Sequence, residues 1–303
     1  FKKNENHLLN MTSKVKDYIN VFIILSFAWI IALGGGYESL SYNGYPILII
    51  CMVTSFLVHW IIFIPSFLAK TEKFYDITGT VAYLVTLYIA SSLTSYSSGE
   101  SLEVRTKIII GMVSFWAIRL GVFLFIRVLR VGEDRRFREA KKSFSKYLVW
   151  WTMSGLWVFL TTANALTLII NNKKLDNNFL FYFGVIIWVV GIVFEIVADE
   201  QKRKFRLDKS NKGTFICSGL WSISRHPNYF GEIILWIGIA LVSLPTLHGF
   251  QYITLISPIF IYFLLTRISG VNLLEESADK KWGDSPEYIK YKKITPVLIP
   301  FVK

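Results

Sequence analysis

The chain has 303 residues, of which 53% are hydrophobic and 16% aromatic, and its formal net charge is +12. Soluble domains of this length are far less apolar, so the composition excludes an ordinary soluble protein. Nucleic acid is excluded as the expected partner because the basic residues lie in short loops between apolar runs, where lipid headgroups or anionic small molecules fit better. Two cysteines and four scattered histidines predict neither a disulfide framework nor a metal site.

Apolar runs of membrane-spanning length recur along the whole chain. A span needs about 20 residues, and the first and seventh runs are the shortest. The sequence therefore predicts an all-α, multi-pass transmembrane helical bundle of about seven or eight spans. In chain order, the predicted spans are Tyr18–Leu33, Tyr45–Leu68, Ile77–Tyr96, Lys107–Leu129, Tyr147–Ile170, Phe179–Ala198, Tyr229–Leu244 and Phe250–Ile268.

The loops between these runs alternate in charge. Basic residues gather after the fourth span, after the sixth span and in the tail, whereas Gly34–Gly44 and Pro245–Gly249 carry almost none. With an even number of spans, all the basic segments and both termini fall on one side, which is the cytosol or the mitochondrial matrix. We expect one membrane domain over residues 1–303, in the endoplasmic reticulum or the mitochondrial inner membrane.

The stretch SRHPNYFGE, Ser224–Glu232, stands at the start of the seventh run. Its proline suits the first position of a helix, and the residue before it, His226, is restricted to extended backbone. Arg225 and the free N–H groups of the helix start would attract an anion such as phosphate. Glu232 shares a face with Asn228 inside the apolar run, where an ionisable residue is a functional candidate. Arg225 alone would more often bind headgroups, but the three residues together favour a binding site.

The stretch FEIVADEQKRKFR, Phe194–Arg206, closes the sixth run with a polar stripe at helical spacing. Its acids, Glu195 and Asp199, can accept hydrogen bonds from amides or hydroxyls, and the basic residues one turn further out can hold phosphates. For Arg203 and Lys204, a ladder of salt bridges on a wet helix end is an equally good explanation.

Arg119 lies well inside the fourth apolar run, in FWAIRLGVFLFIRVLR. An arginine at this depth should face the bundle interior and pair with an acid or a ligand. Arg127 and Arg130 are nearer the end of the run and could extend to the headgroups instead.

An acid and a phenol share one helical stripe in KTEKFYDITGT, Lys70–Thr80. Glu72 and Tyr75 are therefore a candidate pair for donating a proton. Because acidic residues also favour the first turn of a helix, a solvated helix start explains the pattern almost as well.

The C-terminal stretch, Asn272–Phe301, is amphipathic and then interrupted by prolines. It could fold back over the mouth of the bundle as a lid. It could equally lie on the headgroups as a surface helix.

Together these stretches resemble the DUF1295 family, which is related to the steroid 5-alpha-reductases, the sterol reductases and the isoprenylcysteine-type methyltransferases. The resemblance covers residues 70–303, with the N-terminal helices of residues 1–69 outside it. It implies a helical bundle with a cofactor cavity open to the cytosol or matrix, NADPH as the cofactor and a lipid-facing entry for the substrate. The motifs that carry it are TEKFYDITGT, FWAIRLGVFLFIR, DRRF, FEIVADEQKRKF, GLWSISRHPNYFGEIILWIG and LLEESADKKWG.

The resemblance implies positions for the cofactor as well. Asn228 and Tyr229 match residues at the nicotinamide end, and the end of the sixth run matches a cofactor-binding helix. From the motifs and the resemblance together, the predicted cofactor-binding residues are Arg119, Arg130, Glu195, Asp199, Arg203, Arg206, Arg225, His226, Asn228, Tyr229 and Glu232.

This chain departs from the reductases at two places. The active-site tyrosine of the steroid reductases falls at Trp116, which has no phenolic proton. The arginine that precedes the paired acids in the tail of the sterol reductases falls at Leu274. Glu72 and Tyr75 therefore become the predicted catalytic residues, and cofactor binding is better supported than steroid reduction.

Three functions follow as hypotheses. The first is NADPH-dependent reduction of a carbon–carbon double bond in an apolar lipid, such as a steroid-like or enone substrate. The second is an S-adenosylmethionine-dependent methyltransferase, although the basic stripe Lys202–Arg206 favours a polyanion over a sulfonium cation. The third is an accessory structural subunit of a larger membrane complex, mitochondrial or otherwise, that keeps the fold, with or without bound NADPH, and has no turnover. The missing phenol at Trp116 keeps this hypothesis open.

Overall fold

The computed structural model describes residues 2–176, 178–268 and 270–302, and these ranges are helical almost throughout. A short hairpin, β1 (Ser41–Tyr42) and β2 (Tyr45–Pro46), joins the first two helices through a turn in which Asn43 and Gly44 both have positive φ. The helices are α1 (Lys2–Gly35), α2 (Ile47–Leu68), α3 (Tyr75–Ser98), α4 (Val104–Val131), α5 (Phe144–Asn171), α6 (Phe179–Leu207), α7 (Pro227–Ser243), α8 (Ile256–Phe263), α9 (Val271–Trp282) and α10 (Pro286–Ile294).

Eight segments of the described chain are long and apolar enough to cross a membrane, which confirms the all-α, multi-pass prediction. The helices extend beyond most of the predicted spans because their charged ends stay helical; α6, for example, continues past Ala198 to Leu207. As predicted, α7 begins at the proline. The backbone of His226 was expected to be extended, but its φ of −136° and ψ of 60° lie outside that region. The last span is less regular than expected, since a 3-10 segment, Gly249–Leu255, precedes α8.

The chain divides into two compact units. In the first, Phe1–Asp176 with Thr246–Leu255, α5 is buried along most of its length and α1 to α4 pack against it. Several threonines of α5 are satisfied locally: the hydroxyls of Thr152, Thr162 and Thr167 donate to backbone carbonyls four residues earlier. A membrane helix can carry threonines inside a bundle in this way without leaving unpaired donors.

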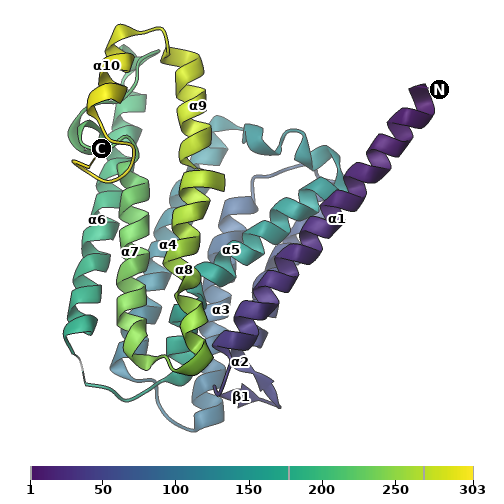
Figure 1. The fold of residues 1–303 in the computed structure, drawn as a ribbon, viewed down its shortest axis with the longest axis vertical. Helices are drawn as coiled ribbons and strands as arrows, with labels where there is room; N and C mark the ends of the chain where they lie inside the picture. Colours follow the sequence, from purple (N-terminus) through teal and green to yellow (C-terminus); the bar gives the residue numbers. More distant parts are fainter. Residues whose placement is uncertain (1, 177, 269, 303) are drawn as a thin grey trace. The chain divides into compact units, whose positions relative to one another are not determined.

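The second unit contains Asn177–Pro245 and Ile256–Lys303. Its α6 and α7 lie side by side (Figure 1), and glycines spaced seven residues apart line their contact. A Cβ atom added to Gly191 would lie 2.6 Å from the Gly231 carbonyl oxygen, and one added to Gly184 would lie 2.7 Å from that of Gly238. The two backbones therefore touch, as small residues allow between membrane helices. This contact holds the charged end of α6 beside the start of α7.

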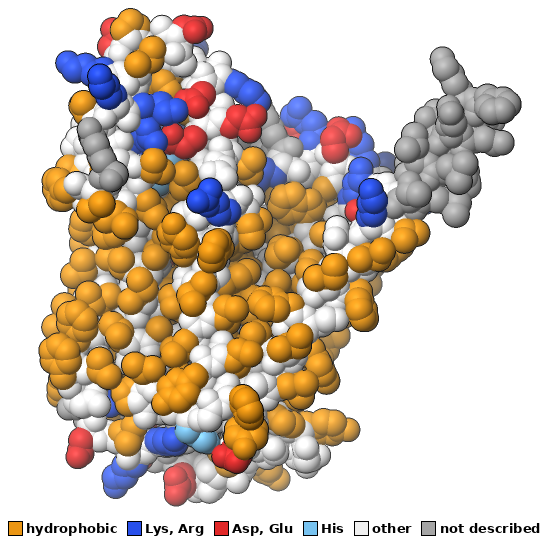
Figure 2. Space-filling view, in the orientation of Figure 1, with side chains coloured by type: hydrophobic (Ala, Val, Ile, Leu, Met, Phe, Trp, Pro, Cys, Tyr) orange, Lys and Arg blue, Asp and Glu red, His pale blue; other side chains and the backbone are white. Residues whose placement is uncertain are grey.

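Polarity changes along the second unit. Figure 2 shows hydrophobic side chains over the length of its helices, and lysine, arginine and acidic side chains gathered at the end that carries α10. Exposed apolar side chains on α6, such as Ile186 and Val193, suit contact with lipid. The candidate site lies at the charged end.

Candidate functional site

The connection from α6 to α7 is docked onto both α6 and the C-terminal tail. The Trp221 indole N–H donates to the Ala198 carbonyl at 3.0 Å, and the Tyr291 hydroxyl donates to the Trp221 carbonyl at 2.6 Å. The backbone N–H of Arg225 donates to the Pro296 carbonyl at 2.9 Å. The tail therefore folds back over the start of α7, which is the first of the two placements that its amphipathic pattern left open.

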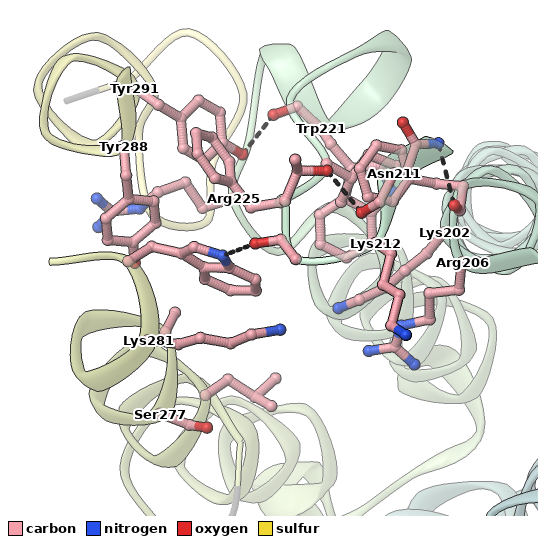
Figure 3. A pocket seen from close by; sticks show the side chains of 18 of the residues that line it. Lys202, Arg206, Asn211, Lys212, Trp221, Arg225, Ser277, Lys281, Tyr288 and Tyr291 are labelled. Atoms are coloured by element: carbon pink, nitrogen blue, oxygen red, sulfur yellow. Dashed lines mark hydrogen bonds between the residues drawn. The ribbon is translucent and has the colours of Figure 1, made fainter. Parts of the chain in front are cut away.

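A cavity of about 530 Å³ lies between the end of α6, the connection that follows it, and α9 and α10. In Figure 3, Lys202, Lys212 and Arg206 end on one side of this space, and Lys281 reaches toward it from α9. The basic side chains of the lining are Lys202, Arg206, Lys209, Lys212, Arg225 and Lys281, and the acids are Asp208 and Glu275. The cavity is therefore strongly positive and would attract a polyanion.

Aromatic rings form much of the remaining wall. The ring of Phe215 lies 5.1 Å from that of Tyr288 and 5.8 Å from that of Trp282, centroid to centroid. The Trp282 indole N–H donates to the Gly213 carbonyl at 2.6 Å, which fixes this ring on the connection. The Lys202 ammonium stands 4.2 Å from the centroid of the Trp221 ring. Flat apolar faces beside cations suit a ligand that combines an aromatic base with phosphates.

The start of α7 forms an electrostatic network with α9. The Glu275 carboxylate accepts from His226 Nε2 at 2.8 Å and pairs with Arg225 at 3.1 Å. Burial lowers the pKa of His226, and Glu275 raises it by less, so the ring favours its neutral form. Because Nε2–H donates to the carboxylate, Nδ1 is the acceptor. Among the described side chains, His226 Nδ1 and Arg225 Nε are buried without a hydrogen-bond partner, at the wall of the cavity.

The structure brings several predicted cofactor residues together in this unit. Arg206, Arg225 and His226 line the cavity, and Tyr229 stacks on His226 with the two rings 5.7 Å apart. The Asn228 amide donates to Asp199 Oδ1 at 3.3 Å, which joins α7 to α6.

Three further predicted residues lie elsewhere on α6 and α7. Glu195 and Glu232 are buried within the two helices. Arg203 pairs with Glu200 at 2.6 Å, in the salt-bridge arrangement that was the alternative for it.

The predicted residues Arg119, Arg130, Glu72 and Tyr75 belong to the first unit. Arg119 lies over the ring of Phe123, with 5.5 Å between its guanidinium carbon and the ring centroid, and Arg130 is exposed at the end of α4. The Tyr75 hydroxyl donates to the Trp150 carbonyl at 2.9 Å.

Glu72 and Trp116 are both buried in the first unit. Glu72 accepts from Lys141 Nζ at 2.8 Å and from the backbone N–H of Asp134 at 2.9 Å, so it fixes the loop that follows α4. Trp116 packs edge-on against Tyr83, with the ring centroids 5.3 Å apart.

Sequence reasoning missed the contribution of the tail and the connection to the cavity. Lys281, Trp282 and Tyr288 come from α9 and the start of α10, and Phe215 and Lys212 come from the connection. The amphipathic pattern of the tail, with lysines beside a tryptophan, was the available signal, but it does not show which surface the helix covers.

These features define a multi-pass membrane protein with a basic, aromatic-walled cavity in its C-terminal unit. The chain belongs to the DUF1295 family, described as "Protein of unknown function (DUF1295)", which matches residues 62–295 and so confirms the resemblance, beginning somewhat before Lys70.

Three curated proteins are similar to parts of the chain. The probable O-methyltransferase ustE of Ustilaginoidea virens is 33% identical over 98 residues, which is 32% of this chain and 34% of that protein. The rat (Rattus norvegicus) 3-oxo-5-alpha-steroid 4-dehydrogenase 1 is 30% identical over 122 residues, or 40% and 42% of the two chains. The steroid 5-alpha-reductase DET2 of Arabidopsis thaliana is 30% identical over 125 residues, again 40% and 42%. The chain spans less than half the length of each relative, and no solved structure matches it.

Proposed function

We propose that the cavity of the second unit binds NADPH and that the protein reduces a carbon–carbon double bond in an apolar lipid. The observation that carries the proposal is the charge of the cavity. Six basic side chains line it with two acids, and the acids are engaged: Glu275 with Arg225, and Asp208 with the Ser210 hydroxyl at 2.7 Å. NADPH carries a diphosphate and a further phosphate, which such a donor set can neutralise.

The residues present fit this cofactor. Lys202, Arg206, Lys212 and Lys281 would hold the phosphates, and the aromatic wall would face the adenine. Following the family resemblance, Asn228 and Tyr229 would lie toward the nicotinamide. When bound, NADPH supplies a hydride, and the chain's task is to hold the cofactor and keep water away from the reacting carbon.

Reduction also consumes a proton, for which Glu72 and Tyr75 are the proposed source. Both hydrogen bonds of Glu72 are accepted bonds, from Lys141 and from the backbone of Asp134, whereas the Tyr75 hydroxyl is itself a donor. Tyr75 is therefore the better group to deliver a proton, and it must exchange its bond to the Trp150 carbonyl to do so. Glu72 would position the start of α3, which carries Tyr75.

The membrane setting agrees with an apolar substrate and a soluble cofactor. The cavity lies at the charged end of the second unit, and we propose that this end faces the cytosol or the mitochondrial matrix, where NADPH is available. A lipid with its double bond conjugated to a carbonyl would be polarised by a hydrogen bond in a dry site.

The similarity to a probable O-methyltransferase favours a second candidate, methyl transfer from S-adenosylmethionine. That cofactor carries two positive groups, a sulfonium and an ammonium, and a single carboxylate. The six cations of the lining would repel the two positive groups and attract only the carboxylate. The charge of the cavity therefore places this function second.

Purified full-length protein, incubated separately with NADPH and with S-adenosylmethionine, tests the proposal. We expect NADPH to be retained through desalting, as detected by mass spectrometry, and then to be oxidised when an enone-bearing lipid is added. Retention of S-adenosylmethionine without NADPH would overturn the proposal. A protein that retains NADPH, turns over no enone lipid and co-purifies with a fixed set of partners would overturn the reductase proposal in favour of an accessory subunit.

A further inference from the structure

A groove of about 420 Å³ opens on the first unit between the end of α2 and the start of α3. Three hydroxyl side chains reach it, and that of Thr78 donates to the carbonyl of Phe74 at 2.6 Å within its own helix. The interior is otherwise hydrocarbon and suits an acyl chain. Its apolar walls are Ile62, Pro65 and Ala69 on one side and Phe74, Ile77 and Val81 on the other.

The local sequence builds this groove. Pro65 sits near the end of α2, Lys70 takes a positive φ of 50°, and the backbone N–H of Thr71 donates back to the Ser66 carbonyl at 3.0 Å. This pattern ends a helix tightly, so α3 starts only a few residues later and the two helices stay close. Ala69 is small, which leaves the mouth of the groove open.

The groove opens on an exposed apolar surface. Phe74 and Val81 line it and are 49% and 46% exposed, and Ile64 and Leu68 at the same end of α2 are 58% and 75% exposed, as lipid-facing side chains are. From Ala69 down to Ile62 the groove runs along two helical turns, about 10 Å. That is a large part of the ~15 Å from headgroup level to the middle of a bilayer.

The mouth of the groove is positively charged. Lys70 and Lys73 are exposed and stand next in sequence to Ala69 and Phe74, which line the groove. The acid between them does not cancel this charge, because Glu72 is buried and takes its hydrogen bonds from Lys141 and Asp134. Two exposed lysines that flank the groove in sequence would suit a lipid phosphate.

We propose that this groove binds an anionic phospholipid, with one acyl chain between α2 and α3 and the phosphate against Lys70 and Lys73. A sterol or another neutral lipid would fill the hydrocarbon part and leave both lysines unused. The site lies in the first unit and stands whether or not the second unit binds NADPH.

Native mass spectrometry of the full chain in detergent, with dioleoylphosphatidylglycerol or dioleoylphosphatidylcholine added, tests the proposal. The wild-type protein should bind phosphatidylglycerol about tenfold more tightly than phosphatidylcholine, since each lysine near an anionic headgroup strengthens binding. The double variant Lys70→Gln/Lys73→Gln should bind the two lipids equally. Ala69→Phe, which fills the mouth, should lose both.

The matched control is Lys14→Gln/Lys16→Gln, which removes the same charge from exposed positions on α1 of the same unit. It should keep the preference for phosphatidylglycerol. Equal binding of both lipids by the wild-type protein, or the same loss of preference in the control as in the Lys70/Lys73 variant, would overturn the proposal. Unchanged binding in a folded Ala69→Phe protein, checked by circular dichroism, would do so too.

Discussion

Two basic segments of this chain look alike in sequence and differ in structure. The segment 127–146 has eight basic and three acidic residues, and 202–225 has seven basic and one acidic. In the first, every described acid is paired: Arg136 with Asp134 at 2.6 Å, Arg138 with Glu133 at 2.7 Å and Lys142 with Glu139 at 2.7 Å. In the second, four of the seven cations line a cavity and a fifth reaches it from the segment's C-terminal end.

The difference between the two segments indicates which basic residues of a loop can be expected to bind a ligand. Acids within five residues of a cation offer it a partner. Glu133, Asp134 and Glu139 each hold one in the first segment, and Glu200 holds Arg203 beside the start of the second. In the second segment four cations line the cavity with the lone acid, Asp208, and the fold adds Lys281 from α9 to the same space. The positions of the acids in a loop therefore carry more information about binding than its net charge.

The largest expected effect on cofactor binding comes from removing charge in the cavity. In Arg206→Gln/Lys212→Gln, NADPH should bind at least ~150-fold more weakly, because two charge-assisted contacts to phosphate are lost, each of about 1.5–3 kcal/mol. Quenching of the cavity tryptophans, Trp221 and Trp282, would report binding. The matched control is Arg138→Gln/Lys142→Gln in the first segment, which should bind as the wild type does. An equal loss of NADPH binding in both variants would show that binding depends only on the net charge of the protein and not on the cavity.

The next effect concerns the acid that anchors the first segment. Glu72→Gln should lower the free energy of unfolding by about 2 kcal/mol, because Lys141 loses a buried ionic partner. Thermal unfolding in detergent would measure it. Glu139→Gln, which removes an exposed pair, should leave the unfolding temperature unchanged.

Tyr75→Phe distinguishes a catalytic role of Tyr75 from a structural one. It should abolish turnover while NADPH binding and folding stay close to wild type, since it removes one hydrogen bond to the Trp150 carbonyl. Full turnover in Tyr75→Phe would remove Tyr75 from the reaction and leave it as part of the core.

NADPH binding by the cavity should also depend on the close contact between α6 and α7. Gly191→Ala places a methyl group 2.6 Å from the Gly231 carbonyl oxygen and should cost about 1.5 kcal/mol of stability while weakening NADPH binding. Gly111→Ala on α4, where a Cβ meets no atom within 4 Å, is the control and should change neither. Identical behaviour of the two variants would mean that the helices can slide without disturbing the cavity.

The smallest expected effect is a dependence on pH. Because the pKa of His226 is lowered in the folded protein, the unfolded state takes up a proton first as the pH falls. Stability should be highest above pH ~6.5 and decline below it, and His226→Gln should flatten the decline. Unfolding midpoints between pH ~7.5 and ~5 would show this, with His248→Gln as the control. An equally steep decline in His226→Gln would assign it to other groups.

The sequence predicted the class of fold because a membrane span is a local property, read from about 20 consecutive residues. The start of α7 was predictable for the same reason, since Pro227 acts on its own backbone and on His226. The irregular entry to α8 was not, because a 3-10 segment and a helix differ little in composition.

The site was predictable only where its residues are neighbours in the chain. Arg206, Arg225 and His226 came from contiguous motifs, whereas Phe215 and Lys281 reach the cavity through a connection and a tail whose packing depends on distant partners. The ionic partner of Glu72 could not be predicted for the same reason, since Lys141 is 69 residues away in the chain. Long-range pairing decides which charges are neutralised, and a periodic pattern does not contain it.

One measurement tests the central claim most directly, which is that the second basic segment forms a site for a polyanionic dinucleotide. Purified protein is titrated with NADPH and, separately, with S-adenosylmethionine, while tryptophan fluorescence, to which Trp221 and Trp282 of the cavity contribute, is followed in wild type and in Arg206→Gln. NADPH should bind more tightly than S-adenosylmethionine, and Arg206→Gln should weaken the binding of NADPH alone. Tighter binding of S-adenosylmethionine, or NADPH binding that Arg206→Gln leaves unchanged, would contradict this claim.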